Sequence, residues 1–161
     1  MKEVKTKRID GYLHRIIQIE GDQNKINYTL QPIGWEFKPR DFFQILMGAA
    51  ILAIPLAFTG EVWDLGKDLS MTRVVWIGIT TITILGLYVY FNMYRFHLRN
   101  YIPHFLIRIC LIYLGSLTVV TIILLLIDKA PFLTAPQIAI KRIVIIGFAS
   151  SMSATVTDSL K

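Results

Sequence analysis

Charged residues and cysteines are both scarce in this chain. Only 17% of its 161 residues are charged, while 54% are hydrophobic. A soluble domain of this length needs more polar residues than this to cover its surface, so the composition excludes an ordinary soluble protein. The single cysteine, Cys110, excludes an internal disulfide, and no group of Cys and His residues has the spacing of a zinc site.

Motifs of catalytic sites are also missing. His14, His97 and His104 lie in separate segments, and there is no Gly-x-Ser-x-Gly, His-Glu-x-x-His or phosphate-binding glycine loop. We therefore expect no enzyme, no metal and no cofactor. The formal net charge is +6, which in a soluble protein would suggest nucleic acid. Here the basic residues lie at the ends of apolar runs, so we expect the lipid bilayer as a partner and not nucleic acid.

Four apolar runs are long enough to cross a bilayer. A helix rises about 1.5 Å per residue, so roughly 20 residues cross a hydrocarbon core about 30 Å thick. The predicted fold is an all-α membrane protein with four transmembrane helices, at about residues 42–60, 74–94, 103–127 and 137–157. The last run is long enough only if Pro136 begins the helix and Lys141 and Arg142 reach the membrane interface.

The first forty residues form a polar head in front of the four-helix domain expected at 41–161. Tyr12 to Glu20 is rich in isoleucine, and the sequence from Gly21 to Asn24 is typical of a turn. After it, Ile26, Tyr28 and Leu30 alternate with polar residues. This pattern predicts a small β-hairpin at the cytoplasmic membrane surface. A tail without regular structure is the alternative.

Lys and Arg are distributed unevenly along the chain. The first forty residues carry eight of them, and Arg95 and Arg99 lie between the second and third spans. The other two connections contain Lys67 and Lys129 together with four acidic residues. Cytoplasmic loops carry an excess of Lys and Arg. We therefore expect a multi-pass protein of the cell membrane with both the N- and C-termini in the cytoplasm.

Two carboxylates follow the first span. Glu61 and Asp64 are three residues apart, so a helix that continues past the span would place both on one face. Carboxylates at the mouth of a pore concentrate cations, which makes these two residues candidates for an ion pathway. The alternative is a structural role, in which they pair with Arg73, Lys141 or Arg142.

Small and hydroxylated residues crowd the second half of the fourth span. Hydroxyl groups that face a water path can replace part of an ion's hydration shell. The candidates for an ion pathway here are Ser150, Ser151, Ser153, Thr157 and Asp158. The alternative is close helix packing, for which Gly147 and Ala154 are candidates together with Gly48 of the first span. Asp158 also has a possible partner in Arg108 of the third span.

Two stretches of the chain have recognisable patterns. In the first, Met47 to Gly66, an apolar helix with a proline runs into Glu61-Val62-Trp63-Asp64-Leu65-Gly66, which has the pattern Glu-x-Trp-x-x-Gly. The second is the small-residue stretch from Gly147 to Ala154. Together they resemble a prokaryotic family of small predicted integral membrane proteins of unknown function. The likeness covers the membrane part of the chain. It implies an integral membrane fold and no particular activity.

These features lead to two hypotheses about function. The first is a homo-oligomeric ion channel for inorganic cations. Because so small a chain has little interior for a polar path, its pore would lie on a symmetry axis between copies. The second is a non-conducting accessory or scaffold protein that packs through its small-residue helix faces. The residues that face an oligomer axis would distinguish the two.

The charge distribution makes a topology prediction. Residues 1–40 and Lys161 should lie in the cytoplasm. In a Cys110→Ser background, a cysteine that replaces Lys25 should react with a membrane-impermeant thiol reagent only after cell lysis. A cysteine at Lys67 is the matched control and should react in intact cells. Labelling of position 25 from outside would contradict the predicted orientation.

Overall fold

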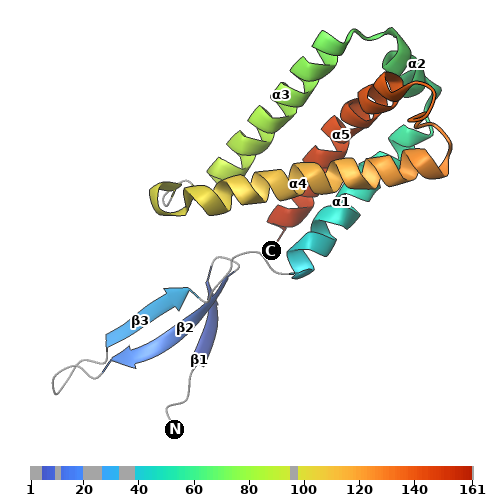
Figure 1. Cartoon of the computed structure of the whole chain (residues 1–161). Coiled ribbons are helices and arrows are strands. Elements are labelled where there is room, and N and C mark those ends of the chain that lie inside the picture. The colour runs from blue at the N-terminus through green and yellow to red at the C-terminus, as the bar shows by residue number, and fades with distance from the viewer. Residues whose placement is uncertain (1–4, 10–11, 20–26, 33–38, 95–97, 161) are drawn as a thin grey trace. The chain divides into compact units, whose positions relative to one another are not determined.

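The computed structural model describes residues 5–9, 12–19, 27–32, 39–94 and 98–160 (Figure 1). The chain divides into two compact units. The first comprises Met1–Lys38 with Lys161, and the second comprises Pro39–Leu160. The head and the helical domain are therefore described separately.

The first unit contains a three-stranded antiparallel sheet in the order β1-β2-β3. The strands are β1 (Lys5–Ile9), β2 (Tyr12–Ile19) and β3 (Asn27–Pro32). Ile9 pairs with Tyr12, and Ile19 pairs with Asn27. The turn expected between Gly21 and Asn24 lies outside the described residues, so the predicted hairpin stays a prediction.

The second unit is helical. Its elements are α1 (Pro39–Ala57), α2 (Gly60–Asp68), α3 (Met71–Val89), the π-helix η1 (Tyr90–Tyr94), α4 (Leu98–Leu126) and α5 (Pro136–Ser159). Four segments are long and apolar enough to cross a membrane, namely Arg40–Ala57, Met71–Asn92, Phe105–Leu126 and Pro136–Ser159. The prediction of four membrane-spanning helices is thus confirmed, and the chain is a multi-pass integral membrane protein.

The first span ends three residues earlier than expected. The backbone becomes extended at Thr59, and α2 then begins as a separate helix at Gly60. The hydroxyl of Thr59 donates to the carbonyl of Leu56 at 2.7 Å, which satisfies one of the carbonyl groups left free at the end of α1. Glu61 and Asp64 therefore lie on a short helix of their own. The fourth span begins at Pro136, as the sequence predicts.

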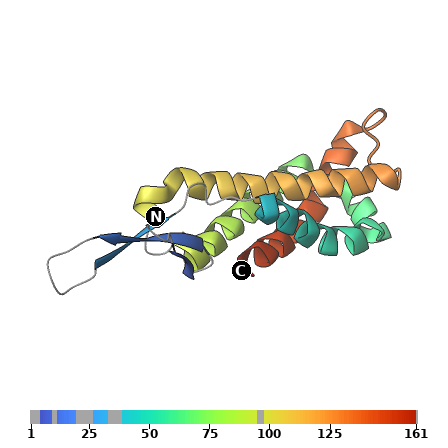
Figure 2. The same cartoon turned by 90° about the horizontal axis from the view of Figure 1, so that it is seen from below.

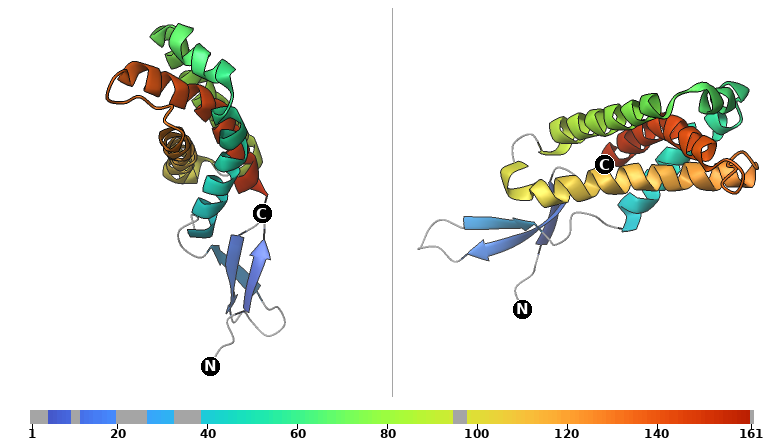
Figure 3. Two further views of the ribbon diagram at one scale, coloured as in Figure 1. Left: turned by 90° about the vertical axis from the view of Figure 1, so that its right-hand side faces the viewer. Right: turned by 45° about the horizontal axis from the view of Figure 1, so that its top comes forward.

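Helix α5 is the centre of the bundle. It packs against α1, α2, α3 and α4, and half of its span is buried, compared with 22% of the span that contains α3. The C-terminal half of α5 lies beside α1 (Figure 2). The helix passes between α3 and α4 (Figure 3). The buried polar side chains of α5, such as Ser150 and Ser151, therefore have other helices around them instead of lipid.

Small residues allow α5 to approach its neighbours closely. A Cβ atom added to Gly48 would lie 2.5 Å from the hydroxyl oxygen of Thr157 and 3.0 Å from the Cα atom of Ala154. A Cβ atom added to Gly147 would lie 2.5 Å from a methyl carbon of Leu117 on α4. Gly48 and Ala154 thus form one close contact between α1 and α5, while Gly147 forms another with α4. Close approach through small residues is a common way to associate helices in membranes.

The α1–α5 contact predicts a difference between two glycines. Gly48→Ala should lower the free energy of unfolding by ~1–3 kcal/mol, because the added methyl group must displace the backbone of α5. Gly60→Ala is the control, since no atom lies within 4 Å of a Cβ added there. Unfolding by denaturant in detergent micelles would measure both. Equal stabilities for the two variants would contradict the close contact.

Candidate functional site

Three of the four hydroxyl side chains proposed for an ion pathway donate to carbonyl groups of this chain. Ser150 and Ser151 are both completely buried. Ser150 Oγ donates to the carbonyl of Ala49 on α1 at 3.0 Å, and Ser151 Oγ donates to the carbonyl of Phe148 at 3.0 Å. Thr157, which is partly buried, donates to the carbonyl of Ser153 at 2.8 Å. These hydroxyl protons are therefore used within the chain, as is common for Ser and Thr in helices.

A buried ion pair joins α4 to α5. Arg108 and Asp158 have side chains that are 3% and 1% exposed. Both Nε and Nη2 of Arg108 contact Oδ2 of Asp158, at 2.8 Å and 2.6 Å. A lone charge at membrane depth is costly, so pairing is what allows either residue to be there. The structure thus brings together the two residues that the sequence suggested as partners.

Three consecutive residues at the end of α5 each contact a different helix. Thr157 packs against Gly48 of α1, and Asp158 pairs with Arg108 of α4. The hydroxyl of Ser159 lies 3.0 Å from that of Tyr88 on α3. We call this last turn, residues 157–159, the hub. It holds the three other spans together at one end of the bundle.

A second arginine holds the other end of α5, where α2 lies. Arg142 is only 6% exposed. Its Nε and Nη2 atoms donate to the carbonyl of Trp63 at 3.3 Å and 3.1 Å, and Nη1 donates to the carbonyl of Lys129 at 2.7 Å. The carbonyl groups come from α2 and from the α4–α5 loop, which lie outside the four spans. The expectation that Arg142 reaches the membrane interface stays a prediction.

Two residues of the sequence pattern Glu-x-Trp-x-x-Gly, Trp63 and Gly66, contact this arginine. Trp63 Nε1 donates to the carbonyl of Ala57, the last residue of α1, at 2.8 Å. A Cβ atom added to Gly66 would lie 2.5 Å from Cγ of Arg142. Trp63 therefore closes the end of α1 and binds Arg142 through its carbonyl, while Gly66 leaves room for the arginine side chain. We call Trp63, Gly66 and Arg142 the clamp.

The end of α4 supplies the other carbonyl of the clamp. Asp128 has a left-handed backbone with φ 56°. The amide of Lys129 donates to the carbonyl of Leu124 at 2.8 Å, and the amide of Asp128 donates to that of Leu125 at 3.1 Å. This is the Schellman pattern of a helix C-terminus. The Lys129 ammonium also lies 4.3 Å from the centroid of the Trp63 ring, within cation–π distance.

The clamp could not be predicted from the sequence. From the sequence alone, Arg142 is expected only to reach the membrane interface or to pair with a carboxylate. The motif that carries the family resemblance did contain Trp63 and Gly66, and that was the available signal. The motif does not indicate which arginine it contacts, because Trp63 and Arg142 are far apart in the sequence.

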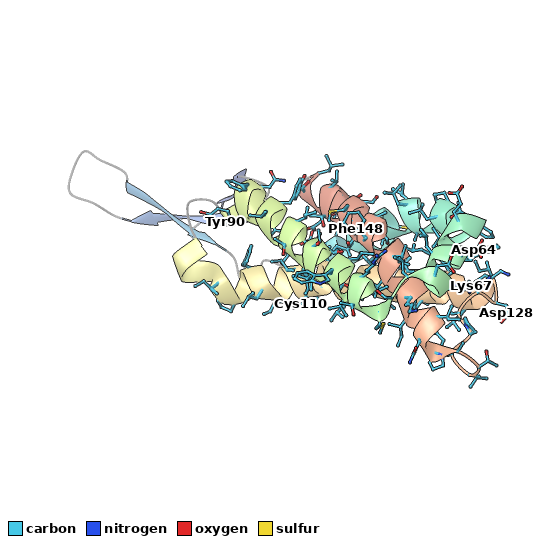
Figure 4. All side chains as sticks on the ribbon, turned by 90° about the horizontal axis from the view of Figure 1, so that it is seen from above. Asp64, Lys67, Tyr90, Cys110, Asp128 and Phe148 are labelled. Atoms are coloured by element: carbon cyan, nitrogen blue, oxygen red, sulfur yellow. The ribbon has the colours of Figure 1, made fainter. Side chains whose placement is uncertain are left out.

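The two carboxylates of α2 face away from the bundle. Glu61 and Asp64 are both exposed. Asp64 pairs with Lys67 at 3.1 Å, and both of these side chains are more than half exposed. Figure 4 shows Asp64 and Lys67 at the same end of the helical domain as Asp128. Exposed pairs of this kind contribute little to stability, and both carboxylates are accessible to solvent.

Within the ranges that the structure describes, no group of three His, Cys, Asp or Glu residues could hold a metal ion. No protein family, curated protein or solved structure matches the chain. The function must therefore be argued from the contacts of α5 and α2.

The buried pair predicts strong coupling between two side chains. Arg108→Ala or Asp158→Ala alone should lower the free energy of unfolding by ~3–5 kcal/mol, because each leaves an uncompensated buried charge. The double variant Arg108→Met with Asp158→Leu should lose much less than the sum, since it removes both charges. The matched control, Lys67→Ala with Asp64→Ala, removes an exposed pair and should have little effect. Additive losses at 108 and 158 would contradict a functioning ion pair.

Proposed function

We propose that this chain is a non-conducting membrane protein, an accessory subunit or scaffold. The observation that carries the proposal is the use of the polar side chains of α5. Ser150, Ser151 and Asp158 are buried, and each bonds to a group of the same chain. They are the residues that a conducting path along α5 would need.

Ion conduction requires polar groups that replace water around the ion. Ser150 and Ser151 are completely buried, so their hydroxyl oxygens have no access to an ion in water. The charge of the Asp158 carboxylate is already compensated by the Arg108 guanidinium. Both ends of α5 are also tied to neighbouring segments, by the hub at one end and the clamp at the other. Such a bundle is suited to a fixed shape, which is what a scaffold in the membrane needs.

The membrane itself is proposed to be the cell membrane, with both termini in the cytoplasm. The support is the excess of Lys and Arg in the first forty residues and at Arg95 and Arg99. Membership in the prokaryotic family that the Glu61 to Gly66 motif resembles is part of the same proposal, and it supplies no activity.

A homo-oligomeric cation channel is the second candidate. It is favoured by the exposed carboxylates of Glu61 and Asp64 on α2, which lie at one end of the helical domain. In that arrangement the pore would lie between copies, and Ser153 and Thr157, which are only partly buried, would be the residues of α5 best able to reach it.

Flux into liposomes separates the two candidates. Purified protein should give no uptake of Na⁺, K⁺ or Ca²⁺ above that of empty liposomes, at any protein-to-lipid ratio. A pore-forming peptide in the same liposomes shows that the assay responds.

The channel reading makes the opposite prediction for the same assay. Uptake should rise with protein, and Glu61→Gln with Asp64→Asn should reduce it most at low salt, where charges are least screened. Ser150→Ala with Ser153→Ala should change its selectivity. Any such protein-dependent, carboxylate-dependent flux would overturn the proposal.

A further inference from the structure

The end of α3 carries an apolar groove on the surface of the helical domain. The groove has a volume of about 440 Å³ and is lined by Ile84, Leu87, Tyr88, Phe91 and Asn92. These residues belong to the last turns of α3 and to η1. Figure 4 shows Tyr90 of η1 at the end of the domain opposite Asp64. The volume falls within the range of ~300–1,000 Å³ that is usual for small-ligand sites.

Two walls of the groove are held in place by contacts within the domain. The hydroxyl of Tyr88 lies 3.0 Å from that of Ser159, so the Tyr88 ring is tied to the hub. Phe91 packs edge-on against Tyr90, with the ring centroids 5.2 Å apart. Phe91 and Tyr90 belong to the π-helix, a rare conformation that is frequent at functional sites. The walls are therefore arranged before a ligand arrives, which lowers the cost of binding one.

The groove lies at membrane depth along most of its length. All five lining residues belong to the apolar span Met71–Asn92, which ends at Asn92. The Asn92 amide is therefore placed where the hydrocarbon core meets the headgroups. At 1.5 Å per residue, Ile84 lies about 12 Å deeper along the helix. The groove is thus apolar within the hydrocarbon and polar at its mouth, which is also how a phospholipid is built.

A second helix fits this groove poorly. Helices associate in membranes through small residues, which let their backbones approach closely. The lining, which lies wholly within the described residues, has large side chains and no Gly, Ala or Ser. Leu87 and Phe91 are more than half exposed, so they would hold another helix backbone away. An acyl chain is thin and flexible enough to lie between such side chains.

We propose that the groove binds one phospholipid of the bilayer that the chain spans. An acyl chain lies along Leu87 and Phe91, and the Asn92 amide donates to an ester or phosphate oxygen of the same lipid. Because the described lining carries no charge, the site takes zwitterionic and anionic phospholipids alike. This inference rests on the membrane-spanning helices, and it holds whether or not the chain conducts ions.

The test counts the phospholipids that the full chain retains when it is released from detergent micelles in native mass spectrometry. At low lipid concentration we expect one bound phospholipid per chain, with similar affinity for phosphatidylcholine and phosphatidylglycerol. Leu87→Trp fills the groove and should lower the affinity about tenfold. Leu114→Trp is the matched control. Leu114 lies on α4 outside the groove and is 59% exposed, compared with 54% for Leu87, so this variant should bind as the unmodified chain does.

The polar mouth of the groove has a matched pair of its own. Asn92→Leu removes one hydrogen bond to the lipid and should lower the affinity about fivefold. Gln137→Leu removes an exposed amide at the start of α5 and should have no effect. This pair decides the question if Leu87→Trp fails to fold.

Three results would overturn the proposal. The first is equal affinity within both matched pairs, and the second is retention of anionic phospholipid alone. The third is a dimer of the chain that Leu87→Trp disrupts, because a second copy would then occupy the groove.

Discussion

The absence of water inside a bilayer is the constraint on which this structure depends. A polar group at that depth must find its partner in the protein, and the cost of failing to do so is several kcal/mol per group. Helix α5 carries more buried polar residues than the other spans among the residues described, and it is also the helix that packs against α1, α2, α3 and α4. Its central position is what makes its composition possible. On the surface of the bundle, the same residues would face hydrocarbon.

The two buried arginines meet this constraint in different ways. Arg108 pairs with a carboxylate, so the charge is compensated by an opposite charge between α4 and α5. Arg142 instead donates to the carbonyl oxygens of Trp63 and Lys129. Those carbonyls are available because α2 folds back over α5 and α4 ends in a left-handed turn at Asp128. The irregular segments are thus tied to the bundle by the same bonds that satisfy the arginine.

This use of polar groups bears on function. Several residues of α5 would suit an ion path if only the sequence were considered. In the fold, these residues join α5 to α1 and α4. What remains available to partners lies elsewhere, on the exposed carboxylates of α2. These carboxylates are not needed to hold the four spans together. A division between a fixed core and accessible ends is what an accessory or scaffold protein would require.

The sequence by itself determined the four spans, because the length and apolar character of a run depend on no other part of the chain. It also suggested Arg108 as a partner of Asp158, since two opposite charges in membrane spans have a higher free energy when separated than when paired. Only the tertiary structure decided which way the residues of α5 face, because a stripe of serines suits a pore and a helix contact equally well. The tertiary structure also decided the contacts of the clamp. Trp63, Gly66 and Arg142 acquire their roles only when α2 folds over the start of α5, and that fold depends on contacts between distant segments.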